Sequence, residues 1–390
     1  MSRSGLRVLV AHSFYRIPGG EDGAVRQQVE LLSRRHHVEL LARQNADLPG
    51  RLSTARRMTF SSRERSDVES LVDRFRPDVI HLHNAYPALG PSVHLVAHKR
   101  AIPLVMTMHN FRLRCPNGYM FTEGEPCRRC EGGLYHNAVI HRCFPSRSQA
   151  MGYATALWAH RFLMRLDDKV DLYMTPSDFM RHRMLDWGFE ASRVEVVRNF
   201  TTGLKRSERL GSYGLYLGRI SSEKGIDVLL RSLSKAGDPP FKVAGDGPVL
   251  NALQELAAGL GLHHTEFLGR LSRDEVERTL ADARYVALPS SWDENAPLAA
   301  LEAMASGKPL LVTSTGGLVE LVENGEGLEC PIGDVDAIAA AIVRLSTEDD
   351  LCRALGERAL KRADSDFTPE THLGRLQAVY DKCLATKRAD

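Results

Sequence analysis

The sequence predicts a globular α/β protein with two domains, each built on a parallel β-sheet. Its 390 residues suit two domains, because one domain commonly holds about 150 residues. Short apolar runs alternate with segments of helical spacing, which is the pattern of strand–helix–strand units. The alternation stops at a polar stretch near the middle of the chain and then begins again, so the same architecture is expected twice.

The first half begins with an apolar run at residues 6–11, which predicts a buried strand. Val25, Val29 and Leu32 then fall on one face of a helix. Further strands are expected at residues 38–41, 77–83 and 103–108, with a helix at residues 67–75 and a short helix before the last strand. Strands that are separated by helices indicate a parallel sheet.

A polar stretch at residues 201–214, with three glycines and no apolar period, separates the two halves. Strands are then expected at residues 215–217, 241–244, 265–268, 285–288 and 310–313. Ser272 and Glu275 form a capping box, and the apolar face of a later helix comprises Ile338, Ala341, Ile342 and Leu345. The last helix is expected to open at Thr368 and Pro369 and to end near Leu384. Both halves are therefore predicted to be Rossmann-like, over residues 1–203 and 204–366, followed by a C-terminal helix at 367–390.

The two halves differ in charge. Residues 1–200 hold 29 Lys and Arg against 20 Asp and Glu, or +9, whereas residues 201–390 hold 22 against 29, or −7. Either two domains of different ancestry or an anionic partner of the first half explains this difference. No apolar run approaches the roughly 20 residues of a membrane-spanning helix, and the odd number of cysteines does not suit a secreted disulfide scaffold. We therefore expect a cytoplasmic protein.

A glycine-containing turn follows the first strand of each half. In the first half it includes Gly19 and Gly20, whose backbone amides could approach an anion at a helix start. In the second half, Arg219 and Lys224 lie between Gly218 and Gly225, and the two cations together suit a diphosphate. Neither turn is the GxGxxG fingerprint of dinucleotide-binding proteins. The alternative is a pair of structural turns with solvated cations.

The most informative segment, residues 289–309, contains two glutamates with seven residues between them. Glu294 lies in a loop, and Glu302 lies in a helix that is expected to begin near Ala296. Carboxylates at a helix start accept hydrogen bonds from sugar hydroxyls, while free backbone amides face phosphate. The alternative for Glu302 is an ordinary charge on a helix surface.

This segment resembles the signature of glycosyltransferase family 4, whose members are retaining enzymes of the GT-B fold. Glu294, Glu302, Ala303-Met304-Ala305 and Gly307 match that signature. Other pieces match in the same order along nearly the whole chain: Gly19-Gly20, His109, Asn199, Gly218-Arg219, Lys224-Gly225, residues 244–248, residues 267–269, Thr315-Gly316-Gly317 and Glu320. Glu294-Asn295-Ala296-Pro297 stands where many members read Glu-Gly-Phe-Gly, which leaves the donor sugar open.

The resemblance implies an enzyme that transfers a sugar from a nucleotide-diphospho-sugar, in a cleft between the domains, with the C-terminal helix returning to the first domain. Arg219 and Lys224 would bind the diphosphate, Glu302 the ribose and Glu294 the donor sugar, while His109 would face the reacting sugar. The expected catalytic residues are thus His109, Glu294, Arg219 and Lys224. The expected donor-binding residues are Gly19, Gly20, Arg219, Lys224, Gly245, Leu271, Glu294, Asn295, Ala296, Pro297, Leu298 and Glu302.

The resemblance also implies that no metal or other cofactor is required for catalysis. The acceptor would be a glycan, a lipid-linked molecule or a small molecule held by the first domain, and no nucleic-acid partner is expected. Two alternatives stay open: a GT-B sugar-nucleotide epimerase, which needs no acceptor, and a non-catalytic nucleotide-sugar-binding protein. A Rossmann dehydrogenase is disfavoured, because the sequence lacks the GxGxxG fingerprint of that class.

Cysteines gather in an insertion at about residues 111–148, in the pattern C-x11-C-x2-C-x12-C. Cys115, Cys127, Cys130 and Cys143 could together hold a structural zinc ion. Free cysteines or a regulatory dithiol are the alternatives.

The segment 152–166 places Trp158 and Phe162 among arginines, and more arginines lie at residues 51–65. Both stretches resemble the membrane-contacting regions of transferases that use lipid-linked acceptors, so peripheral contact with the inner face of the cell membrane is expected. A core helix and a solvated loop are the alternatives.

Overall fold

A computed structural model describes residues 5–16, 19–48, 51–202 and 210–389. The chain divides into two compact units, and each is an α/β unit with its own parallel sheet. The first unit comprises Met1–Glu123, Cys127–Val197 and His372–Asp390, and the second comprises Gly124–Pro126 and Arg198–Thr371. The division in the chain lies after Val197, where the sequence placed it after residue 203. Residues beyond Val197 belong to the second unit because Arg198 pairs with Glu320 and the Thr201 amide donates to the Phe367 carbonyl.

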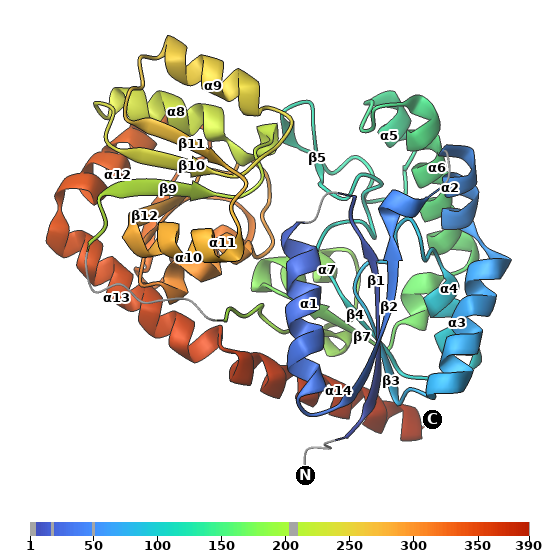
Figure 1. The fold of residues 1–390 in the computed structure, drawn as a ribbon. Helices are drawn as coiled ribbons and strands as arrows, with labels where there is room; N and C mark the ends of the chain where they lie inside the picture. The colour runs from blue at the N-terminus through green and yellow to red at the C-terminus, as the bar shows by residue number, and fades with distance from the viewer. Residues whose placement is uncertain (1–4, 17–18, 49–50, 203–209, 390) are drawn as a thin grey trace. The chain divides into compact units, whose positions relative to one another are not determined.

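The first unit contains a six-stranded sheet in the order β2-β1-β3-β4-β7-β8 (Figure 1). All of its strand pairs are parallel, which confirms the predicted fold class. The strands are β1 (Arg7–Phe14), β2 (His37–Gln44), β3 (Val79–Leu82), β4 (Leu104–Thr107), β7 (Leu172–Thr175) and β8 (Val194–Val196). Two short strands, β5 (Phe121–Thr122) and β6 (Glu125–Pro126), form a small sheet of their own.

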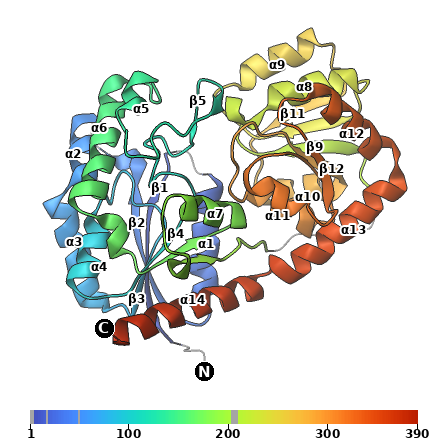
Figure 2. The same ribbon diagram turned by 180° about the vertical axis from the view of Figure 1, so that it is seen from behind.

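Helices cover both faces of the first sheet (Figures 1 and 2). The C-terminal helix α14 packs beside α1, where the Gln28 amide lies 2.9 Å from the His372 ring. The α-helices of this unit are α1 (Gly20–Ser33), α2 (Arg51–Thr59), α3 (Ser62–Phe75), α4 (Ser92–Lys99), α5 (Asn137–Ile140), α6 (Arg147–Trp158), α7 (Asp178–Asp186) and α14 (Pro369–Ala389). A π-helical turn, Ala159–Leu163, continues α6, and 3-10 turns lie at Asn45–Asp47, Leu166–Lys169 and Ala191–Arg193.

The second unit repeats this plan with the strand order β11-β10-β9-β12-β13-β14, again all parallel. Its strands are β9 (Tyr213–Leu217), β10 (Phe241–Ala244), β11 (Thr265–Gly269), β12 (Ala283–Leu288), β13 (Leu310–Thr313) and β14 (Gly327–Cys330). Its α-helices are α8 (Ile226–Lys235), α9 (Leu250–Gly259), α10 (Arg273–Asp282), α11 (Leu298–Ala305), α12 (Val335–Thr347) and α13 (Asp349–Asp366), and 3-10 turns lie at Ser222–Lys224 and Gly316–Leu321.

Two hydrophobic clusters place these helices on opposite faces of the second sheet. Buried residues of α8, α9 and α12 form one cluster, and those of α10, α11 and α13 form the other. The capping box of Ser272 and Glu275 is confirmed at the start of α10. The predicted apolar face is confirmed as well, because Ile338, Ala341, Ile342 and Leu345 are buried on α12.

Five strands and two helix boundaries differ from the expectations. The sequence does not predict the strands β5, β6, β7, β8 and β14. Helix α11 begins at Leu298 rather than near Ala296, because Pro297 has extended backbone angles and supplies no N–H. Helix α14 continues to Ala389, beyond the predicted end at Leu384. In the part of the chain that the structure describes, no helix combines the length and apolar character needed to cross a bilayer.

Both sheets contain a point where the chain reverses its direction of winding. In the first sheet this point lies between β1 and β3, and in the second it lies between β9 and β12. Loops that leave the carboxyl ends of two such neighbouring strands diverge, which leaves room for a ligand. The residues that follow β1, β3, β9 and β12 are therefore the first place to look for a functional site.

Candidate active site

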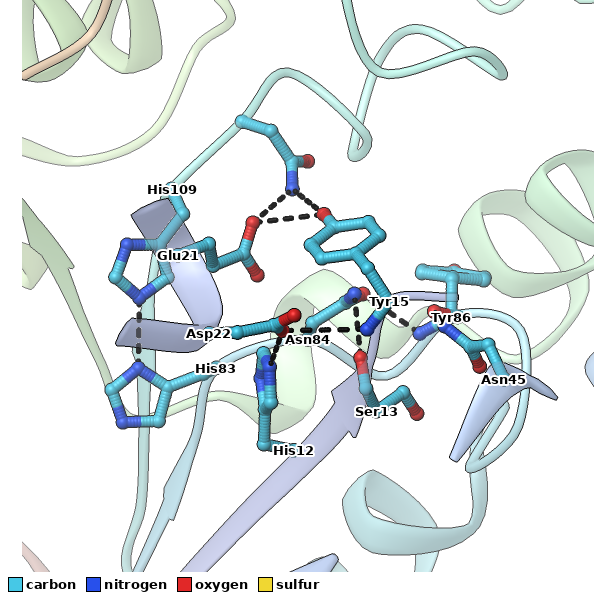
Figure 3. A network of polar contacts seen from close by, with 11 residues as sticks. His12, Ser13, Tyr15, Glu21, Asp22, Asn45, His83, Asn84, Tyr86 and His109 are labelled. Carbon is cyan, nitrogen blue, oxygen red and sulfur yellow. Dashed lines mark hydrogen bonds and ion pairs between the residues drawn. The ribbon is translucent and has the colours of Figure 1, made fainter. Parts of the chain in front are cut away.

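A cluster of histidines lies at the carboxyl ends of β1, β3 and β4 in the first unit (Figure 3). We call His12, His81, His83 and His109 the histidine cluster. His83 Nδ1 is 2.8 Å from His109 Nε2, and the two rings are almost parallel, at 19°. His81 stacks on His83 with ring centroids 4.2 Å apart, and its own nitrogens contact the hydroxyls of Tyr380 and Thr107 at 2.7 Å.

Acidic residues at the start of α1 face the same region (Figure 3). His12 Nε2 is 2.9 Å from Asp22 Oδ1. The Tyr15 hydroxyl donates to Glu21 Oε2 at 2.8 Å, and the Asn110 amide donates to the same oxygen at 3.1 Å. Asn110 directly follows His109, so the loop after β4 is tied to the first turn of α1.

Three rings of the histidine cluster, those of His81, His83 and His109, are neutral at physiological pH. Burial lowers the pKa of His109, and burial together with the neighbouring imidazoles holds the pKa of His83 well below its usual value. Burial lowers the pKa of His81 to about 3. Among the described residues, His83 Nε2 and the second oxygen of Asp22 have no hydrogen-bond partner. Buried polar atoms usually have a hydrogen-bond partner, and a bound ligand can supply one.

In the second unit, a buried ion pair joins the loop after β9 to the loop after β12. Lys224 Nζ is 2.5 Å from Glu294 Oε1, and the Ser290 hydroxyl donates to the same oxygen at 2.7 Å. Burial opposes the ionisation of Glu294. Even so, the Lys224 ammonium and hydrogen bonds from Lys224, Ser290 and Trp292 hold its pKa below the ordinary value. The side chain of Glu294 is therefore an ionised carboxylate, with an exposed fraction of only 8%.

Two glycines allow the loops after β9, β10 and β12 to approach one another. Gly225 has φ +65°, and a Cβ at this position would lie 2.0 Å from the Pro289 carbonyl oxygen. Gly245 has φ +145°, and a Cβ there would lie 1.8 Å from the Gly218 carbonyl oxygen. Any side chain would push the loops apart, so both positions require glycine.

Arg219 and Glu302 have partners that the sequence did not indicate. The Arg219 guanidinium pairs with Glu223, whose carboxylate also accepts from the Ser221 hydroxyl at 2.8 Å. Glu302 Oε1 accepts from Arg273 Nη1 at 2.6 Å. Burial raises the pKa of Glu302, and Arg273 only partly offsets this effect. Neither Glu223 nor Arg273 was among the predicted site residues, because nothing local in the sequence relates either one to its partner.

The remaining predicted donor-binding residues lie on three segments. Gly19 is the exposed N-cap of α1, and Gly20 is its first residue. Leu271, before α10, packs against the second hydrophobic cluster. Asn295 is buried, Ala296 accepts a hydrogen bond from Asn199 at 3.4 Å, and Pro297 and Leu298 open α11. The first amides of a helix lack intrahelical acceptors and suit an anion, but at the start of α11 Pro297 has no N–H and the Ala300 amide donates to the Pro297 carbonyl at 3.1 Å.

The four cysteines of the insertion line one small cavity. Burial raises the pKa of the Cys115, Cys130 and Cys143 thiols, that of Cys130 to about 12. A reactive dithiol needs a depressed thiol pKa, so the regulatory-dithiol alternative is disfavoured. Cys115 Sγ donates to Asn117 Oδ1 at 2.8 Å. Among the described residues, no group of three His, Cys, Asp or Glu side chains is already arranged as metal ligands.

Comparisons with known proteins agree with this architecture. A model of Glycosyltransferase Family 4 matches residues 19–201, and a model of glycosyl transferases group 1 matches residues 211–362. The chain is 28% identical over 332 residues to the glycogen synthase of Mycobacterium tuberculosis, covering 81% of this chain and 70% of that enzyme. It is 28% identical over 199 residues to the alpha-D-kanosaminyltransferase of Streptomyces kanamyceticus, covering 48% of this chain and 51% of that protein.

Solved structures share the fold over nearly the whole chain. The crystal structure of Anabaena HepE in complex with UDP and glucose superposes with a TM-score of 0.71 at 18% identity, covering 97% of this chain and 100% of that one. Sucrose-phosphate synthase from Thermosynechococcus elongatus superposes with a TM-score of 0.72 at 17% identity, covering 98% and 100%. With two successive family models matched between residues 19 and 362, the chain belongs to glycosyltransferase family 4 and has the GT-B fold.

Proposed function

We propose that this enzyme is a retaining hexosyltransferase that uses a nucleotide-diphospho-sugar donor. The observation that carries the proposal is the buried pair of Lys224 and Glu294, which sets a cation and a carboxylate side by side at the winding reversal of the second sheet. Such a pair suits a ligand with an anionic part next to a polyol. HepE, which shares the fold, has been crystallised with UDP-glucose.

The reaction breaks the bond between the anomeric carbon and the diphosphate oxygen, and a bond from that carbon to an acceptor oxygen forms. Positive charge develops on the sugar ring while negative charge builds on the leaving diphosphate. Lys224 and Arg219 are assigned to this diphosphate. Lys224 is the better placed of the two, because its side chain is 16% exposed whereas that of Arg219 is 44% exposed. With cations and backbone amides in this role, catalysis requires no divalent metal.

Three further residues receive roles under this proposal. Glu294 accepts hydrogen bonds from the donor sugar through Oε2, the oxygen that Lys224 and Ser290 do not contact. Glu302 accepts from the ribose, for which it must share its carboxylate with Arg273. His109 contacts the reacting sugar, and the histidine cluster holds its ring in a fixed orientation.

The acceptor is assigned to the first unit. The polar groups that face the histidine cluster, Glu21 and Asp22, suit an acceptor rich in hydroxyl groups. A lipid-linked acceptor receives separate support from an exposed apolar patch of Trp158, Phe162 and Leu163, whose exposed fractions are 47%, 47% and 67%. Such a patch beside Arg161 is typical of proteins that touch a membrane surface. If the acceptor is a glycan or a small molecule, this patch is not needed to contact a membrane.

A donor panel tests the proposal. UDP-, GDP-, ADP- and dTDP-sugars are added separately to the purified enzyme, and the true donor raises the melting temperature because it binds only the folded state. Turnover of that donor is then followed with and without an extract of candidate acceptors, and the anomeric configuration of the product is determined. Release of free sugar and nucleotide without any acceptor would indicate an epimerase, and binding without turnover in every condition would indicate a non-catalytic protein.

A further inference from the structure

The insertion after His109 contains a cavity that is lined by four cysteines. Cys115, Cys127, Cys130 and Cys143 come from three separate turns and surround a space of about 20 Å³. A space that holds a single water molecule measures roughly 10–15 Å³ by the same kind of measure. The cavity therefore suits one small occupant, and Met120 and Ala138 are among its other lining residues.

Backbone hydrogen bonds hold three of the cysteines at this cavity. The Cys115 carbonyl accepts from the Gly118 amide at 3.0 Å, and the Cys130 carbonyl accepts from the Gly133 amide at 2.9 Å. Both glycines have positive φ, +80° and +92°. The Cys127 amide donates to the Met120 carbonyl at 2.6 Å. These turns direct the cysteines inward without any contribution from the sulfur atoms.

The charge of the insertion complements a metal thiolate centre. Residues 111–148 contain six arginines and three glutamates, with no lysine or aspartate. Arg129 Nη1 lies 3.8 Å from Cys127 Sγ. A divalent cation with four thiolates has a net charge of −2, which the excess of arginines in the insertion offsets.

We propose that Cys115, Cys127, Cys130 and Cys143 bind one Zn²⁺ ion, which stabilises the insertion. Four sulfur ligands in a closed site are typical of structural zinc. On binding, each thiol releases its proton to solvent. The hydrogen bonds that Cys115 and Cys143 now make to Asn117 and Thr122 are lost, because their thiols turn toward the ion by a change of rotamer.

The ion would supply stability that the insertion otherwise lacks. Before α6 begins at Arg147, its regular elements are α5, of four residues, and the strands β5 and β6, of two residues each. Short segments with little core are often held together by a metal. The insertion begins next to Asn110, whose side chain contacts Glu21 and Tyr15. Zinc would thus also determine where Asn110 lies beside the start of α1.

Metal analysis of the full-length protein tests the proposal. The enzyme is purified without chelators from zinc-supplemented cultures, and its metal content is measured by mass spectrometry. We expect about one zinc per chain in the wild type and in Cys330→Ala, whose cysteine is buried in β14 of the other unit. The double variant Cys127→Ser/Cys130→Ser should lose the zinc and melt at a temperature lower by on the order of 5 °C or more.

Measurements on the wild type alone decide the question if the double variant does not fold. Stripped wild-type protein to which Co²⁺ is added should show the strong visible and charge-transfer absorption of a tetrahedral tetrathiolate. The four thiols should resist alkylation until the metal is removed. Three results would overturn the proposal: freely alkylated thiols with no bound metal, disulfides between these cysteines, or the absorption of an iron–sulfur cluster. The test does not depend on the transferase reaction, so its failure leaves the proposed function untouched.

Discussion

His83 Nδ1 and His109 Nε2 lie 2.8 Å apart and share a single proton. His83 Nε2, the other nitrogen of that ring, has no hydrogen-bond partner among the described residues. If His83 donates from Nδ1, only a lone pair remains unpaired. If His109 donates instead, the proton of His83 is on Nε2, and a buried N–H group remains without a partner. Proteins tolerate an unpaired N–H less well than an unpaired lone pair. We therefore expect His83 to donate, so that the proton of His109 is on Nδ1 and His109 acts as a hydrogen-bond donor toward the sugar.

Replacement of His83 by asparagine and by glutamine should separate positioning from mere packing. The amide nitrogen of Asn reaches the place of Nδ1, so His83→Asn should keep transfer within a few-fold of wild type. His83→Gln places its amide elsewhere and should lower kcat by on the order of 10²-fold, as for a misplaced catalytic group. Nitrogen NMR of the His109 ring should report the Nδ1–H tautomer in wild type and His83→Asn only. Equal rates and the same tautomer in both variants would mean that His83 does not orient His109.

Removal of the cations after β9 should slow transfer without unfolding the protein. Lys224→Ala should reduce kcat/KM by on the order of 10²-fold or more, and Arg219→Ala by a similar or smaller factor, because both are assigned to the leaving diphosphate. Lys235→Ala is the control, since this exposed lysine on α8 pairs only with Asp336 in the described chain. The melting temperature of each variant is measured alongside. Rates near those of wild type in Lys224→Ala and Arg219→Ala would remove the diphosphate assignment.

The two glutamates should respond differently to substitution by glutamine. Glu302→Gln should weaken donor binding by roughly 10-fold, as expected when a charged hydrogen-bond acceptor is lost, whereas Glu294→Gln should mainly reduce kcat. Because burial raises the pKa of Glu302 above that of the unfolded chain, its ionised form costs stability at neutral pH. Glu302→Gln should therefore melt no lower than wild type at pH 7. Identical effects of both substitutions on binding alone would contradict the division of roles.

Acid should destabilise the first unit through its buried histidines. Burial, with His160 and Lys169 nearby, lowers the pKa of His94 to about 3, whereas the ordinary pKa of a histidine is about 6.5. Below about pH 6.5, His94 therefore binds a proton in the unfolded chain but not in the folded chain. Stability is then lost as the pH falls from 6.5 toward 3, by about 1.4 kcal/mol per pH unit for this group. His94→Gln should flatten the dependence of stability on pH, whereas His98→Gln, exposed on the same helix, should not. Denaturant titrations at pH 5 and pH 7 check this, and equal slopes in both variants would contradict it.

Liposome binding should depend on the apolar patch if the acceptor is lipid-linked. The protein should sediment with anionic but not neutral vesicles, and less so in high salt, because basic residues near the surface contribute about 1 kcal/mol each. The triple variant Trp158→Ser/Phe162→Ser/Leu163→Ser should lose this binding. The control, Ile332→Ser/Val343→Ser, removes two hydrophobics of the second unit that are each 43% exposed. Indifference to lipid charge would favour a glycan or small-molecule acceptor.

Arg57 is a poor choice for testing whether the arginines at residues 51–65 bind an anionic membrane, although the sequence suggests that it is solvated. Its guanidinium donates at 2.6 Å to Glu64, whose side chain is fully buried. Arg161 similarly donates to the Glu131 carbonyl at 2.9 Å. Neutralising either one would disturb packing together with charge. Arg56, which is exposed on α2, is a cleaner substitution.

Local periodicity was sufficient to predict the two parallel sheets, but not every strand. Residues 172–175, Leu-Tyr-Met-Thr, are all buried and have no alternation of polar and apolar positions. A short run of this kind cannot be told from a piece of buried helix. Only the neighbouring strands β4 and β8 select the extended conformation of β7. The same ambiguity explains why β8 and β14 were missed.

The sequence by itself determined the fold class, the family and the identity of Lys224, Glu294, Glu302 and His109 as candidate site residues, because these depend on local patterns and short motifs. Only the tertiary structure decided which of these side chains contact one another and which other residues they contact. Lys224 and Glu294 are 70 positions apart, and Glu302 and Arg273 are 29 apart. Parallel strands bring their carboxyl ends to one edge whatever their separation in sequence. A single sequence contains no local pattern that indicates such ion pairs. Their interaction becomes strong only when folding buries both partners away from water.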